Sequence, residues 1–316
     1  MRFLFLLLLI PITLFGQAEF DKAEQLFKNE QFQQAKPIFL SYLKQHPGHG
    51  HTLEYLGDIA GHSKKWDEAL SYYEPLVSAH PQNANYHFKV GGVMGMKALE
   101  NKLKAITLID DIKYHFETAA QLDSRHIEAR WALVEFYMQL PGIFGGSEKK
   151  AMNYANELQS ISPVDGHLAK GYIAEYNDQP VEAEKQYRQA IKVGGSPHTY
   201  EKLTQLYEKN NQPERAMQTA SQSLKIHKRN RLNYQIGKIA AQYNLDPKLG
   251  IEALRAYIQN YSVRDGVSKD WAYYRMAQIY RNMGDKSQAL QWINKALQER
   301  PTFQEAQAEK RQILSL

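Results

Sequence analysis

Apolar residues recur along the chain at intervals of three and four positions, with polar residues between them. Leu53, Leu56 and Ala60 form one such stripe, which has the spacing of a single face of an α-helix. In the run that follows, the small residue Ala69 permits close approach of a second helix, and Tyr73 fills the space one turn later. The pattern therefore predicts a pair of packed helices, neither of which can bury its stripe alone.

The landmarks of this helix pair return after 34 residues. Proline ends each copy, because it cannot continue the second helix. A fixed offset of this kind is typical of a repeat array, in which neighbouring copies stack to bury a shared core. The residue pairs that share the offset are Ala35 and Ala69, Phe39 and Tyr73, Pro47 and Pro81, and Gly57 and Gly91.

One small residue near the start of each second helix marks every copy. The gaps between these markers are 34, 43, 39, 32, 33, 34 and 39 residues, so we expect eight units, with insertions near 93–108, 140–147 and 262–269. The insertion at 93–108 is either a lengthened helix pair or an extra half-repeat, and its helical periodicity favours the lengthened pair. The markers are Ala35, Ala69, Ile112, Ala151, Ala183, Ala216, Gly250 and Ala289.

The final copy carries the pattern in its most complete form. Its landmarks are Tyr273, Met276, Ala277, Tyr280, Ala289, Ile293, Ala296 and Pro301. The pattern resembles the tetratricopeptide repeat, a helix-turn-helix of 34 residues. The resemblance covers Ala18 to Leu314 and implies an all-α fold, an α-α superhelix, with no separate catalytic domain. The stretch from Phe303 to Leu314, with charges between its apolar positions, suits a helix that caps the last unit.

In solenoids of this family the first helices line a concave groove, where ligands are expected. The repeat phase directs these side chains toward that groove: Glu54, Asp58, Phe88, Glu128, Trp131, Glu135, Lys170, Glu201, Gln205, Tyr234, Lys238, Trp271, Tyr274 and Gln278. Aromatic anchors beside hydrogen-bonding groups suit an extended peptide or an exposed helix. We therefore predict a protein-binding set of Phe88, Glu128, Trp131, Glu135, Tyr234, Trp271, Tyr274 and Gln278. The alternative is that Trp131 and Trp271 pack between repeats, since an error of one residue in phase exchanges groove for core.

The first sixteen residues differ from the rest of the chain. Arg2 precedes an apolar run from Phe3 to Phe15, and the small residue Gly16 follows, which is the order of a signal peptide. The run of thirteen residues is too short to cross a hydrocarbon core that needs about 20. We expect a cleaved leader at 1–16 and an exported solenoid at 17–316, periplasmic or secreted, with no transmembrane segment after leader removal. The alternative is an uncleaved N-terminal anchor.

The stretch LPGIFGGS, Leu140 to Ser147, lengthens the turn between the two helices of the fourth unit. Glycines that precede a helix can bind phosphate, but this stretch lacks the GK[ST] ending of a phosphate loop and follows a helix-like run. Ser147 followed by Glu148 predicts a helix N-cap. We interpret the stretch as a structural joint, with an anion site at its backbone amides as the alternative. A similar loop occurs in some exported bacterial tetratricopeptide proteins, which this chain resembles.

Residues that carry catalysis or bind metals are sparse. The sequence has no cysteine, which excludes disulfides, thiolate metal sites and cysteine nucleophiles. His46, His49, His51 and His62 cluster in the first two units, and a zinc or nickel site is one hypothesis for them. No carboxylate or cysteine completes a recognised metal spacing, and the adjacent carboxylates at 110–111 fall on the polar side of their helix. We therefore predict no enzyme activity, no cofactor and no metal.

The chain has a modest positive net charge of +5. Its densest basic run, Lys225 to Arg231, is interpreted as a solvated turn, with attraction to an acidic partner or anionic surface as the alternative. We expect a non-enzymatic exported scaffold that binds other envelope proteins or peptides through its concave groove, and no nucleic acid. The alternative is a periplasmic peptide- or small-ligand-binding component that assists a transport system, with Gly145, Gly146 and Ser147 beside its pocket.

Overall fold

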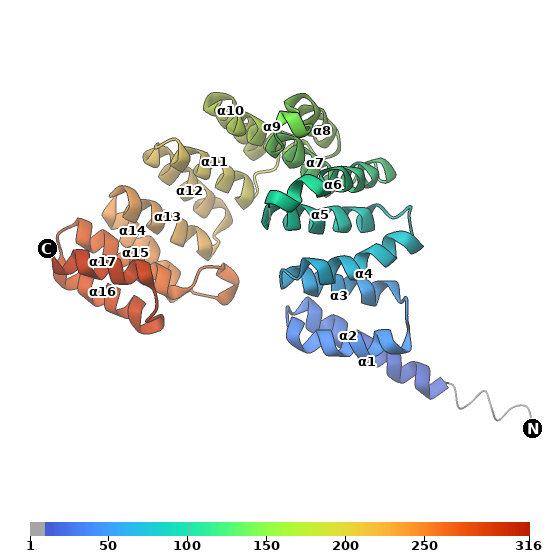
Figure 1. Ribbon diagram of the computed structural model, residues 1–316. Helices are drawn as coiled ribbons and strands as arrows, with labels where there is room; N and C mark the ends of the chain where they lie inside the picture. The colour runs from blue at the N-terminus through green and yellow to red at the C-terminus, as the bar shows by residue number, and fades with distance from the viewer. Residues whose placement is uncertain (1–9, 101) are drawn as a thin grey trace, which may run out of the picture. The chain divides into compact units, whose positions relative to one another are not determined.

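The computed structural model describes residues 10–100 and 102–316, which contain seventeen α-helices, two short 3-10 helices and no strand. Figure 1 shows the helices of each part of the chain following one another as antiparallel pairs. None of these described helices is both long and apolar enough to span a membrane. Residues 1–9 of the predicted leader lie outside the described residues, and its last residues belong to the first helix.

The chain divides into two compact units, residues 1–162 and 163–316. Each unit contains four helix pairs. In the first unit the pairs are α1 (Ile10–Lys28) with α2 (Phe32–Gln45), α3 (Gly50–His62) with α4 (Trp66–Ala79), α5 (Ala84–Glu100) with α6 (Lys102–Leu122), and α7 (Ile127–Gln139) with α8 (Glu148–Ile161). The 3-10 helix η1 (Gly142–Phe144) lies between α7 and α8.

The second unit has the same plan and ends in one additional helix. Its pairs are α9 (Pro163–Tyr176) with α10 (Pro180–Val193), α11 (Pro197–Lys209) with α12 (Pro213–His227), α13 (Asn230–Tyr243) with α14 (Pro247–Gln259), and α15 (Lys269–Asn282) with α16 (Lys286–Glu299), followed by α17 (Gln304–Leu314). The 3-10 helix η2 (Val263–Asp265) precedes α15. All eight marker residues lie in second helices and are buried, which confirms the expected eight units and the closing helix.

The helices of a pair touch where the repeat pattern has its glycine. A Cβ atom added at Gly57 would lie 2.3 Å from the ring of Tyr73, and one added at Gly171 would lie 2.3 Å from the ring of Tyr187. Both tyrosines are almost fully buried. The absence of a side chain at the glycine therefore lets an aromatic ring of the second helix pack directly on the backbone of the first.

The third pair is the lengthened one. Its glycine, Gly91, faces Phe116, and the interval between them is 25 residues, against 16 from Gly57 to Tyr73. The helices themselves account for the longer interval, since α5 and α6 have 17 and 21 residues where α3 and α4 have 13 and 14. The structure thus contains a lengthened helix pair and not an extra half-repeat.

The turns within five pairs share one backbone conformation. In each turn, a residue with positive φ follows the first helix. The backbone amide of the residue after it donates to the carbonyl oxygen five residues earlier, as the amide of Lys65 donates to the carbonyl of Ala60 at 2.9 Å. This is the hydrogen-bonded termination expected when a left-handed residue ends a helix. The residues with positive φ are Glu30, Lys64, Asp178, Asn211 and Gly284.

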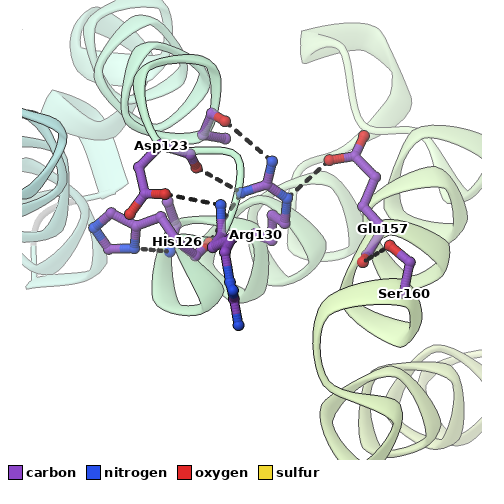
Figure 2. A network of polar contacts seen from close by, with 8 residues as sticks. Asp123, His126, Arg130, Glu157 and Ser160 are labelled. Atoms are coloured by element: carbon purple, nitrogen blue, oxygen red, sulfur yellow. Dashed lines mark hydrogen bonds and ion pairs between the residues drawn. The ribbon is translucent and has the colours of Figure 1, made fainter.

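A buried arginine joins three helices of the first unit (Figure 2). Arg130 of α7 is only 5% exposed. Its guanidinium donates to the carbonyl oxygens of Ala120, Asp123 and His126 at 3.0 to 3.1 Å and to the carboxylate of Glu157 on α8 at 2.8 Å. The planar group therefore satisfies three carbonyls at the end of α6 and the start of α7 while holding α8 against them.

Replacing Gly57 by alanine tests the glycine contact. The added Cβ would overlap the Tyr73 ring, so we expect Gly57→Ala to lower the free energy of unfolding by about 2 kcal/mol. The matched control is Gly61→Ala in the same helix, where an added Cβ meets nothing within 4 Å. That change should be neutral or should stabilise by up to about 1 kcal/mol. Urea unfolding followed by circular dichroism measures both, and equal effects would contradict the assigned contact.

Replacing Arg130 by methionine should cost about 3 kcal/mol of unfolding free energy, because three carbonyls then lack a donor. Glu157→Gln is the comparison, since it keeps those three hydrogen bonds and changes a carboxylate whose side chain is 48% exposed. We expect it to cost less than about 1 kcal/mol. Chemical denaturation measures the unfolding free energy of both variants. A larger loss of unfolding free energy for Glu157→Gln than for Arg130→Met would show that the ion pair contributes more than the three hydrogen bonds to carbonyls.

Candidate protein-binding groove

The added turns of α5 and α6 form an apolar groove on the first unit, with a volume of about 790 Å³. Its walls are one stripe from each of three helices, together with the turn that follows α7. The lining residues are Phe88, Gly92, Gly95, Met96, Ala98 and Leu99 of α5; Ala105, Ile106, Ile109, Ile112 and Phe116 of α6; and Ala132, Glu135, Phe136, Gln139, Leu140, Pro141 and Phe144 of α7 and its turn.

Several apolar side chains of this groove remain exposed. The exposed fractions are 44% for Met96, 65% for Leu99 and 54% for Ile106. A Cβ atom added at Gly92 or Gly95 would meet nothing within 4 Å, so the space in front of these glycines is open. Contiguous exposed apolar surface on a folded chain marks an interaction site.

The LPGIFGGS turn closes one end of the groove. Leu140, Pro141 and Phe144 line the groove, and Ile143 in the same turn is 87% exposed. Gly145 has a φ of 95°, and a Cβ atom on Gly146 would lie 1.7 Å from the carbonyl oxygen of Leu140. Glycine is therefore required at both positions for the turn to fold back on itself.

The amides of this turn are already used within the chain. Those of Phe144, Gly145, Gly146 and Ser147 donate to backbone carbonyls at distances between 2.8 and 3.2 Å. The Ser147 hydroxyl accepts the amide of Lys150 at 3.3 Å, as the predicted N-cap requires. These contacts support the interpretation of the stretch as a joint, because no amide of the four is left to bind an anion.

Four of the predicted binding residues lie in the first unit. Phe88 and Glu135 line the apolar groove, and Phe88 packs its ring 6.0 Å from that of Phe116. Glu128 lines a second, open hollow between the turns that precede α5 and α7, and Phe88 lines this hollow as well. Trp131 is partly buried on α7 and belongs to neither lining. The structure thus places Phe88 in one lining with Glu135 and in another with Glu128.

Three of the four predicted residues in the second unit form one aromatic cluster at its end. Trp271 and Tyr274 of α15 pack against Phe303, with ring centroids 4.6 and 5.4 Å apart. Gln278 donates to the Tyr274 hydroxyl at 2.9 Å. Tyr234 lies on α13, 5.4 Å from the ring of Tyr257. Trp271 is partly buried and packs on Phe303, the residue that precedes the closing helix α17.

Several charged residues expected in the concave groove form ion pairs with residues of neighbouring helices. Glu54 and Asp58 of α3 both pair with Lys89 of α5, the first at 3.2 Å. In the second unit, Lys238 of α13 pairs with Glu208 of α11 at 3.0 Å. These side chains bridge consecutive units of the repeat, so their partners lie within the chain itself.

The clustered histidines have local structural roles. His49 caps α3, with Nδ1 accepting the amide of Thr52 at 3.3 Å, and burial lowers its pKa with smaller contributions from nearby histidines. His46 stacks on Tyr42, and His62 stacks on Phe32. Among the residues that the structure describes, no group of three or more His, Asp or Glu side chains is placed to hold a metal ion.

Two further histidines, His87 and His115, lie in contact between α5 and α6. His87 of α5 is 2% exposed, and its Nδ1 lies 3.0 Å from Nδ1 of His115 on α6. The Nε2–H of His87 donates to the carbonyl of Pro81 at 3.1 Å, so its Nδ1 accepts the hydrogen from His115. Burial, followed by the neighbouring His87, lowers the pKa of His115 to about 4, against an opposing contribution from Asp111.

Comparison with known proteins agrees with the helical repeats. Models of the tetratricopeptide repeat match residues 20–91 and 271–303, so the chain carries tetratricopeptide repeats in both of its units. A search of curated proteins found no match.

Solved structures with a similar fold include a tetratricopeptide repeat protein from Parabacteroides merdae, which is 14% identical over 95% of this chain and 98% of that chain, with a TM-score of 0.52. PilF of Pseudomonas aeruginosa is 12% identical over 71% of this chain and 95% of that chain, with a TM-score of 0.44. YrrB, described as a tetratricopeptide protein with an unusual peptide-binding site, is 14% identical over 62% of this chain and 97% of that chain, with a TM-score of 0.44. The Parabacteroides structure confirms the expected fold class, an all-α chain of the α-α superhelix type.

Replacing His115 by glutamine tests the buried pair. As the pH falls from about 7 to 4, the unfolded chain takes up a proton at this position before the folded chain does, so the folded state loses stability over that window. We expect the loss due to His115 to be about 2 kcal/mol, which allows for its partial exposure to water. His115→Gln should show a correspondingly flatter decline in unfolding free energy, measured by urea titration at several pH values. Parallel declines in the two proteins would contradict the assignment.

Proposed function

We propose that this chain is a non-enzymatic scaffold that binds proteins or peptides in the cell envelope, with the groove between α5, α6 and α7 as its binding site. One observation carries the proposal: the groove is preformed, apolar and exposed, whereas the other helix pairs bury their apolar stripes. Burial of Met96, Leu99 and Ile106 against a partner would provide about 1.5 to 3 kcal/mol for each fully covered side chain.

The envelope location is supported by the apolar leader at the start of the chain. Arg2, the run from Phe3 to Phe15 and Gly16 have the order of charge, apolar core and small residue that directs export. A scaffold in that compartment meets other exported or membrane-anchored proteins. Their exposed segments are the proposed partners.

The absence of catalysis is supported by how the carboxylates are used. Asp110 and Asp111 face solvent on α6. Glu182 and Glu184 on α10 pair with Lys185 and with arginines at 188 and 215. None of these carboxylates is among the described residues that line the apolar groove; the one acidic residue in that described lining is Glu135, and the same described lining contains no second acid–base group.

A second candidate function is a peptide- or small-ligand-binding component that assists transport. The observation that favours it is the size of the groove, since small-molecule sites occupy roughly 300 to 1,000 Å³ and have mostly apolar walls. Leu140, Pro141 and Phe144 of the LPGIFGGS turn line this space, whereas Gly145, Gly146 and Ser147, which were expected beside the pocket, are not among its described lining residues. Binding of a free small molecule that survives removal of the protein partner would favour this function over the scaffold.

Photo-crosslinking locates the partner. A benzophenone amino acid at Ile106, which is 54% exposed in the groove, should crosslink to a partner protein in living cells. The matched control places it at Val181, which is 83% exposed on α10 and is not among the lining residues of the groove. Adding Leu99→Lys should reduce the Ile106 adduct by about tenfold or more, because it places a charge in the apolar contact. Equal adducts at Ile106 and Val181, identified by mass spectrometry, would overturn the proposal.

The same assay tests the concave surface predicted from the repeat phase. The double variant Trp131→Ala/Tyr274→Ala leaves the apolar groove lining unchanged. Partner capture that survives this double change and is lost with Leu99→Lys would assign binding to the groove. The reverse result would assign it to the predicted concave surface.

A further inference from the structure

We propose that the second unit carries a membrane-contact surface, formed by two neighbouring turns that present exposed apolar residues among unpaired cations. The first turn, residues 225–231, leads from the end of α12 into α13. The second turn, residues 262–266, lies between α14 and α15 in the insertion expected near 262–269. The partner is the anionic head-group surface of a lipid bilayer. This inference concerns the second unit alone, so it does not depend on the apolar groove of the first unit.

Asn230, the first residue of α13, joins the two turns. Its side-chain amide donates to the carboxylate of Asp265 at 3.0 Å and to the carbonyl oxygen of Tyr257 at 3.1 Å. The same carboxylate accepts the backbone amide of Ser262 at 2.8 Å. The hydroxyl of Tyr257, a fully buried residue of α14, donates to the carbonyl oxygen of Val267. These contacts hold the second turn beside the first, so the two turns form one surface.

The cations of this surface are exposed, and most of them lack a partner. Arg231 reaches Glu201 at 3.4 Å with its side chain still 62% exposed. The other four are Lys225, Lys228, Arg229 and Arg264. Among the residues that the structure describes, none forms an ion pair or a hydrogen bond with the side chain of any of these four. Their positive charge is therefore directed at whatever lies outside the chain.

Lys228 occupies a backbone position that favours a different residue. Its φ is 53°, which lies in the left-handed region that glycine and asparagine adopt most readily. The other residues of the second unit with positive φ are Asp178, Gly195, Asn211, Asn244, Asp246, Gly266 and Gly284. Lys228 is thus the one long side chain at such a position in residues 163–316, all of which the structure describes. Asparagine or glycine would end α12 with less strain, so the stability of the turn does not account for the lysine.

Each turn also exposes an apolar side chain next to a cation. Ile226, which follows Lys225, is 54% exposed, and Val263, which precedes Arg264, is 84% exposed. At a membrane surface, apolar side chains enter the boundary of the hydrocarbon while long cationic side chains remain at the level of the phosphates. Each Lys or Arg near an anionic bilayer strengthens binding by about fivefold. The composition of the two turns matches this arrangement.

An acidic protein segment fits the surface less well than a bilayer does. A defined anionic group is bound by donors that converge on it, and the hollow between α10, α11 and α12 is lined by Arg188 and Lys192 but by none of the four unpaired cations. An acidic segment would neutralise the cations and leave Ile226 and Val263 in water. A bilayer supplies both anionic head groups and an apolar layer, and its lipids move to match the spacing of the cations.

A dye on each turn tests the proposal. The sequence has no cysteine, so one introduced cysteine can carry an environment-sensitive dye. Full chains labelled through Ile226→Cys or Val263→Cys are mixed with vesicles of phosphatidylcholine, or of phosphatidylcholine and phosphatidylglycerol in equal amounts. The emission should shift to the blue with the anionic vesicles and stay unchanged with the neutral ones. No shift at either position with anionic vesicles would identify the turns as solvated and would overturn the proposal.

The matched label is placed through Val181→Cys, at a residue that is 83% exposed on α10. It should remain in water with both kinds of vesicle. A shift at Val181 equal to that at Val263 would show that contact is not confined to the two turns, and would overturn the proposal. The apolar leader is present in every labelled chain, so attachment through the leader cannot produce a difference between these positions.

Two pairs of charge changes test the role of the cations. Lys228→Gln/Arg229→Gln removes two cations of the first turn, and the control Lys248→Gln/Arg311→Gln removes two exposed cations outside both turns. Anionic vesicles are titrated against the dye at position 263. The first pair should weaken binding by about tenfold to thirtyfold and the control by less than about threefold, and added salt should reduce the difference. Equal effects of the two pairs would assign binding to net charge and would overturn the proposal.

Polyglutamate distinguishes an acidic protein segment from a bilayer. The peptide is titrated against the chains labelled at positions 226 and 263, with circular dichroism confirming that each variant keeps the helical content of the unchanged chain. A change of emission with polyglutamate and none with anionic vesicles would assign the surface to an acidic protein segment. That result would overturn the membrane proposal.

Discussion

In four of the eight helix pairs a large side chain of the second helix packs directly on a glycine of the first helix, and this contact sets how closely the two helices approach. At Gly57 and Tyr73, or Gly171 and Tyr187, the contact leaves no room for even a methyl group. The third pair keeps this contact at Gly91 and Phe116 but separates the two residues by nine more positions, and its helices are longer. α7 has ordinary length, and Met96, Leu99 and Ile106 of the lengthened helices remain exposed.

Much of the fold could be predicted from the sequence, because the same pattern of small and apolar residues recurs in successive helix pairs. The eight markers, the closing helix and the N-cap at Ser147 all follow from residue spacing, and each is present in the structure. The lengthened third pair was also favoured by its periodicity. The division into two units at Ser162 had no such signal, since the interval across it is close to an ordinary repeat.

The candidate site was predicted less well, for a physical reason. Repeat phase indicates the side of a helix on which a residue lies, and two of the residues it selected, Phe88 and Glu135, line the groove. It cannot indicate how far a helix extends past its neighbours. Met96, Leu99 and Ile106 were therefore not selected, although their helical spacing within an insertion was a visible signal. The repeat phase did not predict the ring contacts of Trp271 and Tyr274 with Phe303, because those contacts depend on the path of the chain into α17.

Substitution of Gly92 or Gly95, which both line the groove, would change the shape of the groove without disturbing the packing of the fold. At Gly57 an added carbon collides with the core, but at Gly92 and Gly95 it enters open space. A change from glycine to alanine, serine or valine there alters the contour met by an incoming molecule by one or a few atoms, and leaves the buried contacts of α5 in place. Single substitutions at these glycines in related chains would therefore change which partner or ligand the groove binds, at little cost to the stability of the fold.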